Sequence, residues 1–206
     1  MTIEETLRQE RLGLVRRLRD LPDHAWQAAS LCEGWTVRHV LAHLTTPFTV
    51  SRTAMGLRVL RTGGVSAAMD SVARELAERS PSELLHVLEE NAGSRVHPPA
   101  LPTSAPLTDV VVHSADIRWG LGDDHADWGD AARLRPVLDF LVSPRAAIGF
   151  LPPTRLRGLH LVSSDLDWSA GRGADVRGPS LLLAMAMLGR SAAIPYLVGE
   201  GAARLS

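Results

Sequence analysis

The chain lacks lysine, and its 206 residues include a single cysteine, Cys32. All 22 basic residues are arginine, so catalysis through a Schiff base on a lysine is excluded. One cysteine cannot build a disulfide framework, and this favours a reducing compartment. We therefore expect a cytoplasmic protein whose stability comes from its core.

Long apolar segments are also missing. The longest apolar run covers residues 181–188 and is much shorter than the roughly 20 residues that cross a bilayer. Residues 1–19 are charged and amphipathic and contain no signal-peptide core. The net charge of −1 gives no reason to expect nucleic acid or an anionic membrane as a partner. We expect a monomer or homodimer that binds small molecules.

The remaining composition is that of an ordinary globular protein. Apolar residues make up 45% and charged residues 22% of the chain, which is long enough to bury a core. The exclusive use of arginine, with abundant alanine, glycine and leucine, indicates a GC-rich genome. Actinobacteria are the obvious candidate source.

Helical spacing dominates the N-terminal part of the chain. Apolar positions predict a helix over 3–20 and a second from Thr36, a fair N-cap, to about residue 61. Pro47 lies inside the second span and should kink the helix or break it after three turns. A third helical region covers 65–93 and restarts at Ser80, which is followed by proline and glutamate in a capping-box pattern.

The pattern changes toward the C-terminus. Prolines over 95–105 predict a loop, followed by a helix over 106–119, and Asp130 should cap a further helix ending near residue 142. After two prolines at 152–153 the sequence predicts three strands and an apolar helix, over 156–163, 165–168, 174–177 and 180–188. The expected fold is mainly α, with a helical bundle over 1–145 and a small α+β extension over 152–206.

Two predicted helices carry potential metal ligands. Asp109 and His113 are four residues apart and therefore lie on one helical face, one turn from each other. His43 is flanked by leucine and alanine in the second helix and should face inward. Three ligands from two helices leave one coordination position open, which is typical of a catalytic metal site.

Each of these residues also has an ordinary alternative role. An inward histidine such as His43 is often a hydrogen-bonded core residue, and Asp109 and His113 can form a private salt bridge. His39, one turn before His43, could pair with it, but the glutamate of the His-Glu-x-x-His zinc motif is absent. Asp116 can accept a bond from an imidazole or pair locally with an arginine.

Cys32 has two interpretations of its own. It lies before the second helix with no histidine fixed beside it by sequence, so a structural role is favoured over that of a nucleophile. Trp35, after Gly34, is interpreted as a packed indole at a turn.

Taken together, these segments resemble the DinB-like superfamily of helical bundles, and specifically its maleylpyruvate isomerase family of mycothiol-dependent enzymes. A first matching set runs from the cysteine to a histidine-leucine pair, and a second is an acidic residue, three apolar residues, a histidine and an aspartate. The matching positions are Cys32, Gly34, Trp35, Thr36, Val37, His43, Leu44, Asp109, His113 and Asp116. The C-terminal part also matches, at Ser164, Asp165, Asp167, Trp168, Val176, Arg177, Gly178, Pro179, Gly189, Arg190, Leu197, Gly199 and Gly201.

This resemblance implies a DinB-like four-helix bundle in which His43, Asp109 and His113 hold a divalent metal, usually zinc. The chain departs from the family pattern at three places. Asp109 stands where relatives often carry glutamate, His39 where aspartate is common, and Trp119-Gly120 where many relatives have arginine-proline.

The resemblance also implies a function: a metal-held thiolate of mycothiol attacks an electrophilic small molecule, as in an isomerase or an S-transferase. Arg118 and Arg190 are candidate catalytic residues, because an arginine fork suits a substrate carboxylate. Either arginine could instead form a surface salt bridge. Two other functions stay open, a non-catalytic small-molecule binder or partner subunit and a metal-dependent hydrolase.

Overall fold

The computed structural model divides into two compact units, one of Met1–Pro98 with Asp109–Asp124 and one of Pro99–Thr108 with His125–Ser206. It describes residues 1–98, 100–123, 131–152 and 154–205. Within these described ranges, no helix combines the length and apolarity needed to cross a membrane. The predicted division into 1–145 and 152–206 stays a prediction.

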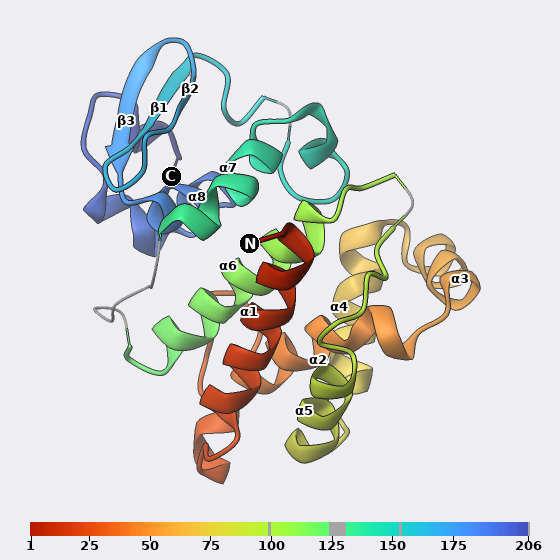
Figure 1. The fold of residues 1–206 in the computed structure, drawn as a ribbon. Helices are drawn as coiled ribbons and strands as arrows, with labels where there is room; N and C mark the ends of the chain where they lie inside the picture. Colours follow the sequence, from red (N-terminus) through yellow and green to blue (C-terminus); the bar gives the residue numbers. More distant parts are fainter. Residues whose placement is uncertain (99, 124–130, 153, 206) are drawn as a thin grey trace. The chain divides into compact units, whose positions relative to one another are not determined.

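The first unit is helical (Figure 1). Helix α2 packs against α4 and α5, α1 packs against α5, and α3 packs against α4. The apolar residues that flank His43 in α2 are buried, as expected: Leu41, Ala42 and Leu44. The helices are α1 (Ile3–Leu18), α2 (Val37–Thr49), α3 (Arg52–Thr62), α4 (Val65–Leu76), α5 (Pro81–Glu90) and α6 (Ser104–Gly120), the last shared between the units.

Local signals account for several helix ends. Thr36 is the N-cap of α2, as predicted, and Ser80 is the N-cap of α5. The Ser80 backbone N–H donates to the Glu83 carboxylate at 2.8 Å, which completes the predicted capping box. Pro47 lies inside α2, and the helix ends two residues later, at Thr49, so the predicted break is confirmed.

The helical part of the chain differs from the predictions at two places. Helix α6 begins at Ser104, two residues before the predicted start, so Pro106 falls in its first turn. A proline is tolerated there because the N–H groups of a first turn have no partner inside the helix. The connection before α2 also contains a 3₁₀ helix, η1 (Asp23–Gln27), which the sequence pattern did not reveal.

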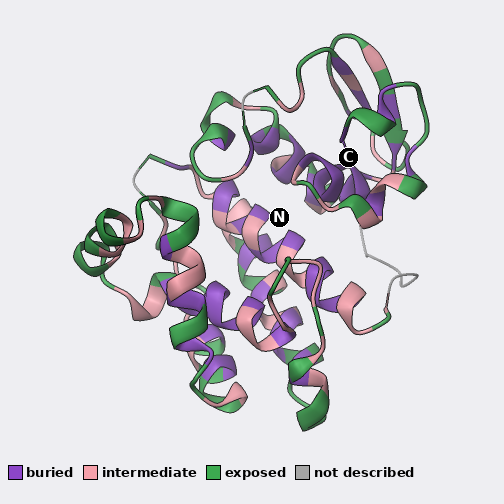
Figure 2. Ribbon diagram, turned by 180° about the vertical axis from the view of Figure 1, so that it is seen from behind, coloured by how far each residue is buried: buried purple, intermediate pink, exposed green. Residues whose placement is uncertain are grey.

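The second unit combines short helices with a three-stranded sheet. Strand β1 (Leu159–Ser163) pairs antiparallel with β2 (Ser169–Gly171) and parallel with β3 (Ala174–Gly178), in the order β2-β1-β3. Helix α8 (Ser180–Met187) is buried throughout and packs against α7 (Arg135–Leu141), as the purple segments of Figure 2 show. Asp130, the predicted cap, lies outside the described residues. The 3₁₀ helices are η2 (Ala131–Leu134), η3 (Pro144–Ala147), η4 (Ser191–Tyr196) and η5 (Ala202–Leu205).

The second predicted strand, over 165–168, is wrong, because these residues form a turn before β2. The Asp165 carboxylate accepts hydrogen bonds from the Ser163 hydroxyl and from the backbone N–H and hydroxyl of Ser180. An aspartate bonded to nearby groups in this way favours a turn over a strand. Strand β1 also starts at residue 159 and not at 156.

Candidate metal centre

The two histidines of α2, His39 and His43, have different partners. The Thr36 backbone N–H donates to Nδ1 of His39 at 3.2 Å, so His39 takes the part of the acceptor in a capping box. Burial and then the positive charge of Arg74 lower the pKa of His39. Among the described residues, His43 belongs to a group of three potential metal ligands, and His39 belongs to no such group. Nδ1 of His39 thus serves the start of the helix, and His43 lies at the candidate metal centre.

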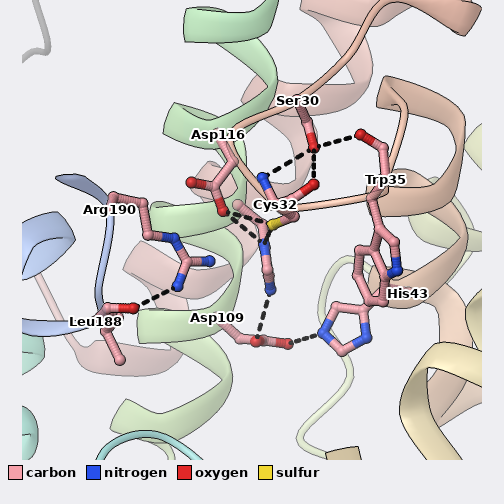
Figure 3. Close-up of polar contacts among 9 residues, drawn as sticks. Ser30, Cys32, Trp35, His43, Asp109, Asp116, Leu188 and Arg190 are labelled. Carbon is pink, nitrogen blue, oxygen red and sulfur yellow. Dashed lines mark hydrogen bonds and ion pairs between the residues drawn. The ribbon is translucent and has the colours of Figure 1, made fainter. Parts of the chain in front are cut away.

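His43, one turn later, meets Asp109 and His113 of α6. Its Nε2 atom lies 3.5 Å from Asp109 Oδ2, and Nε2 of His113 lies 3.5 Å from Asp109 Oδ1. The two imidazole rings meet edge to face, with centroids 4.8 Å apart. The structure thus brings together the three residues that the sequence selected, with one carboxylate facing two imidazoles (Figure 3).

The spacing of these atoms fits a divalent cation. Two ligand atoms each about 2.0–2.1 Å from a tetrahedral zinc ion are about 3.3 Å apart. Each imidazole nitrogen lies 3.5 Å from one oxygen of the Asp109 carboxylate, His43 from Oδ2 and His113 from Oδ1, and this distance is close to the expected value. Two imidazoles and one carboxylate are also the donors found in some catalytic zinc sites.

The hydrogen bonding of His113 strengthens this fit. Its Nδ1 atom lies 2.9 Å from Oδ2 of Asp116, and an ionised carboxylate can only accept, so this contact favours the tautomer with the proton on Nδ1. In the neutral ring Nε2 then presents a lone pair toward Asp109. A lone pair that faces an anion is unfavourable unless a cation lies between them. Of the two roles predicted for Asp116, the structure shows the contact with an imidazole.

Cys32 lies against the same carboxylate. Its thiol donates to Asp116 Oδ2 at 3.1 Å, and Sγ is 3.5 Å from Nδ1 of His113 (Figure 3). No spacing pattern in the sequence indicated these contacts, because 84 and 81 residues separate Cys32 from its partners. The motif match that included the cysteine was the one available signal.

Trp35 covers the imidazoles. The centroid of its ring lies 5.2 Å from that of His43 and 6.4 Å from that of His113. The indole Nε1 donates to the Asp70 carboxylate at 2.7 Å, and the Arg74 guanidinium donates to the same carboxylate. These bonds lower the pKa of Asp70 and hold the indole from its far side. The predicted packed indole therefore packs on the candidate site.

The two candidate catalytic arginines have local partners. Arg118 Nε donates at 3.0 Å to Asp123, which also accepts from Arg17 at 3.0 Å. Arg190, in the second unit, donates from Nη1 to the carbonyl oxygen of Leu188 at 2.9 Å (Figure 3). The role of either arginine toward a substrate stays a prediction.

Comparison with known proteins decides the family. The sequence profile described as the mycothiol maleylpyruvate isomerase N-terminal domain matches residues 7–113, more than half of the chain. The chain belongs to this family. The predicted family is therefore confirmed, and membership supports the prediction that the chain is an enzyme. No protein with a curated description matches it.

Two solved structures have the same fold as this chain. A crystal structure of the mycothiol-dependent maleylpyruvate isomerase matches with a TM-score of 0.59 and 18% identity, over 98% of this chain and 94% of that chain. A second structure of that enzyme, with one histidine replaced by alanine, matches with a TM-score of 0.50 at the same identity and coverage. The predicted fold class, a mainly α DinB-like bundle with a small α+β part, is confirmed.

Proposed function

We propose that this family member is a metal-dependent enzyme that activates a low-molecular-weight thiol, with mycothiol as the thiol. The convergence of His43, Asp109 and His113 carries the proposal, because three protein ligands leave a position for a further ligand. Membership in a family named for mycothiol supports the choice of thiol.

His43, Asp109 and His113 would hold the cation, and two imidazoles with one carboxylate are a donor set found in catalytic zinc sites. The His43 and His113 side chains are 11% and 12% exposed, while that of Asp109 is 32% exposed. Solvent and substrate can thus reach the carboxylate side, and the imidazoles are shielded. A bound divalent cation would lower the pKa of a thiol and keep it as the reactive thiolate.

The thiolate of the cosubstrate would attack an electrophilic carbon of a small molecule. Addition to a conjugated double bond, rotation and elimination give cis–trans isomerisation and return the thiol. Attack on a carbon that carries a leaving group, or on an epoxide, gives a stable thioether. In both reactions Arg118 and Arg190 are the candidate groups for holding a substrate carboxylate, because a guanidinium binds carboxylates through two parallel hydrogen bonds.

Metal content and thiol dependence test the proposal together. We expect purified wild-type protein to bind one zinc ion and His43→Ala to bind none. His86→Ala is the matched control, because the His86 side chain is 68% exposed and lies on α5. Turnover of maleylpyruvate or of an epoxide probe should require added mycothiol in the wild type and in His86→Ala, and should be lost in His43→Ala.

Two results would contradict the proposal and favour another function. Bound metal with turnover that needs no thiol would indicate a hydrolase that activates water. A wild-type protein that binds no divalent metal would indicate a non-catalytic small-molecule binder or partner subunit on the same bundle.

A further inference from the structure

His113 contacts carboxylates through both of its ring nitrogens, and the two carboxylates differ in their surroundings. Asp109, at Nε2, is partly exposed, whereas Asp116, at Nδ1, is completely buried. The Nδ1 contact is also the shorter, at 2.9 Å against 3.5 Å. The buried side of the ring thus has a hydrogen bond of ordinary length, and the exposed side has the spacing of two ligands around a cation.

Asp116 is itself held by a segment that precedes α2. The Cys32 thiol donates to the carboxylate oxygen that accepts from His113, and the Leu31 backbone N–H donates to the Asp116 carbonyl oxygen at 3.3 Å. The Ser30 hydroxyl accepts from the Cys32 backbone N–H at 3.1 Å and donates to the Trp35 carbonyl oxygen at 2.9 Å. These bonds hold the backbone of Cys32 in place, so the short side chain of Cys32 starts from a fixed position beside Asp116.

Gly120 keeps this segment close to α6. A Cβ atom at this position would lie 2.1 Å from the carbonyl oxygen of Ala29, far closer than any real contact. Backbone therefore meets backbone at the end of α6, with the 29–32 segment pressed against the helix. Such close packing leaves Cys32 little freedom to move away from Asp116.

We propose that Asp116 and Cys32 are positioning residues that hold His113 in one tautomer and one orientation. The inference rests on the proposed function for its consequence in metal binding. Asp116 accepts the Nδ1 proton, so the Nε2 lone pair points toward the position between Asp109 and His43. The Cys32 thiol donates to the same oxygen and fixes the carboxylate in the rotamer that His113 needs. Cys32, His113 and Asp116 also form a group that could hold a metal ion, and in the proposed arrangement Cys32 acts as a hydrogen-bond donor to Asp116.

The first test uses metal-free protein and therefore does not depend on the proposed function. Nitrogen-15 NMR at a pH well above the ordinary histidine pKa of about 6.5 reports which ring nitrogen carries the proton. We expect His113 to carry it on Nδ1 in the wild type and in Cys32→Ser, whose hydroxyl can replace the thiol as donor. Asp116→Ala should shift the proton toward Nε2, and an unchanged tautomer in that variant would overturn the proposal.

The second test measures zinc affinity by competition with a chelator. We expect Asp116→Ala to weaken zinc binding by about 10–100-fold, the usual effect of losing the partner of a ligating histidine. Cys32→Ala should weaken it less, and Cys32→Ser should restore most of the loss. Equal affinity in Asp116→Ala and the wild type would contradict the proposal, whereas a wild type without zinc would contradict the proposed function alone.

Cobalt substitution separates a positioning cysteine from a ligating one. A thiolate bound to cobalt gives an intense charge-transfer band, so we expect no such band in the wild type without added thiol. A band that disappears in Cys32→Ala would overturn the proposal and make Cys32 a ligand. Thermal unfolding of each variant checks the fold. Should Asp116→Ala fail to fold, the comparison of Cys32→Ala with Cys32→Ser tests the proposal in its place.

Discussion

Two helices of the first unit carry an imidazole and a carboxylate four residues apart. On α5, Nε2 of His86 lies 3.3 Å from the Glu90 carboxylate, and both side chains are more than 60% exposed. On α6, Nε2 of His113 lies 3.5 Å from the Asp109 carboxylate, and the two side chains are 12% and 32% exposed. The spacing and the distance are nearly the same, yet the surroundings differ.

The difference lies in what surrounds each pair. The α6 pair meets a second imidazole from another helix, and its own imidazole is bonded on the far side to a buried carboxylate. The α5 pair has the character of a surface ion pair, which contributes little and is screened by salt. Sequence spacing alone therefore produces an ion pair, and burial with additional donors turns the same spacing into a candidate metal centre.

The largest expected effect is on zinc affinity, when the carboxylate of the α6 pair is neutralised. Asp109→Asn keeps the shape of the side chain and removes its charge, so we expect zinc affinity to fall by more than the ~100-fold typical of an outer partner. Glu90→Gln makes the matched change on α5 and should leave zinc affinity unchanged. Chelator competition measures both. A similar loss in the two variants would mean that the metal does not select the α6 pair.

A substitution at Gly120 tests whether close packing supports the α6 pair. In Gly120→Ala the new Cβ would overlap the Ala29 carbonyl oxygen, so we expect a loss of about 1–3 kcal/mol of unfolding free energy. Gly56, in the exposed helix α3, has open space where a Cβ would stand, with no atom within 4 Å, and Gly56→Ala should stabilise by up to about 1 kcal/mol.

Urea denaturation measures both glycine variants. Zinc affinity should fall in Gly120→Ala, because the 29–32 segment that carries Cys32 must move. A Gly120→Ala protein with wild-type stability and affinity would show that the segment can retreat from α6 without cost.

The smallest effect concerns the acid side of stability. Hydrogen bonds from Arg74 and Trp35 lower the pKa of Asp70 in the folded protein. The stabilisation that the ionised Asp70 gives to the folded protein is therefore fully present above the ordinary carboxyl pKa near ~3.9. It is lost as the pH falls through the lower pKa that Asp70 has in the folded protein. The Asp70 side chain is 45% exposed, so screening limits the contribution to less than about 1 kcal/mol.

The Asp70→Asn variant should therefore be slightly less stable than the wild type near neutral pH. Its free energy of unfolding should also fall less than that of the wild type as the pH is lowered. Unfolding free energies measured between about pH 5 and 3 give the slope that tests this. An identical slope in the wild type and the variant would show that the indole is held without help from the Asp70 charge.

Much of the fold could be predicted because its signals are local. The capping box at Ser80 and the proline inside α2 act over a few residues, and the corresponding helix ends lie close to where they were expected. The strand predicted over 165–168 failed because the Asp165 carboxylate accepts hydrogen bonds from Ser163, two residues away, and from Ser180, 15 residues away. No spacing rule within a short window contains the contact with Ser180.

The candidate site divides in the same way. His43, Asp109 and His113 could be selected from helical spacing and the family pattern, and the structure brings them together. The partner of Asp116 could not be decided from the sequence, because its position allows both an imidazole and a nearby arginine. The contact of Cys32 with Asp116 depends on how the 29–32 segment docks on α6, which is a tertiary event.

The close approach at Gly120 also restricts how this site can change in evolution. Any residue with a β-carbon at position 120 requires the Ala29 carbonyl to withdraw, and Cys32 belongs to the same short segment. A change at position 120 is therefore expected to need a compensating shift of residues 29–32. Relatives with proline at the position of Gly120 are expected to hold the cysteine-bearing segment farther from the end of α6.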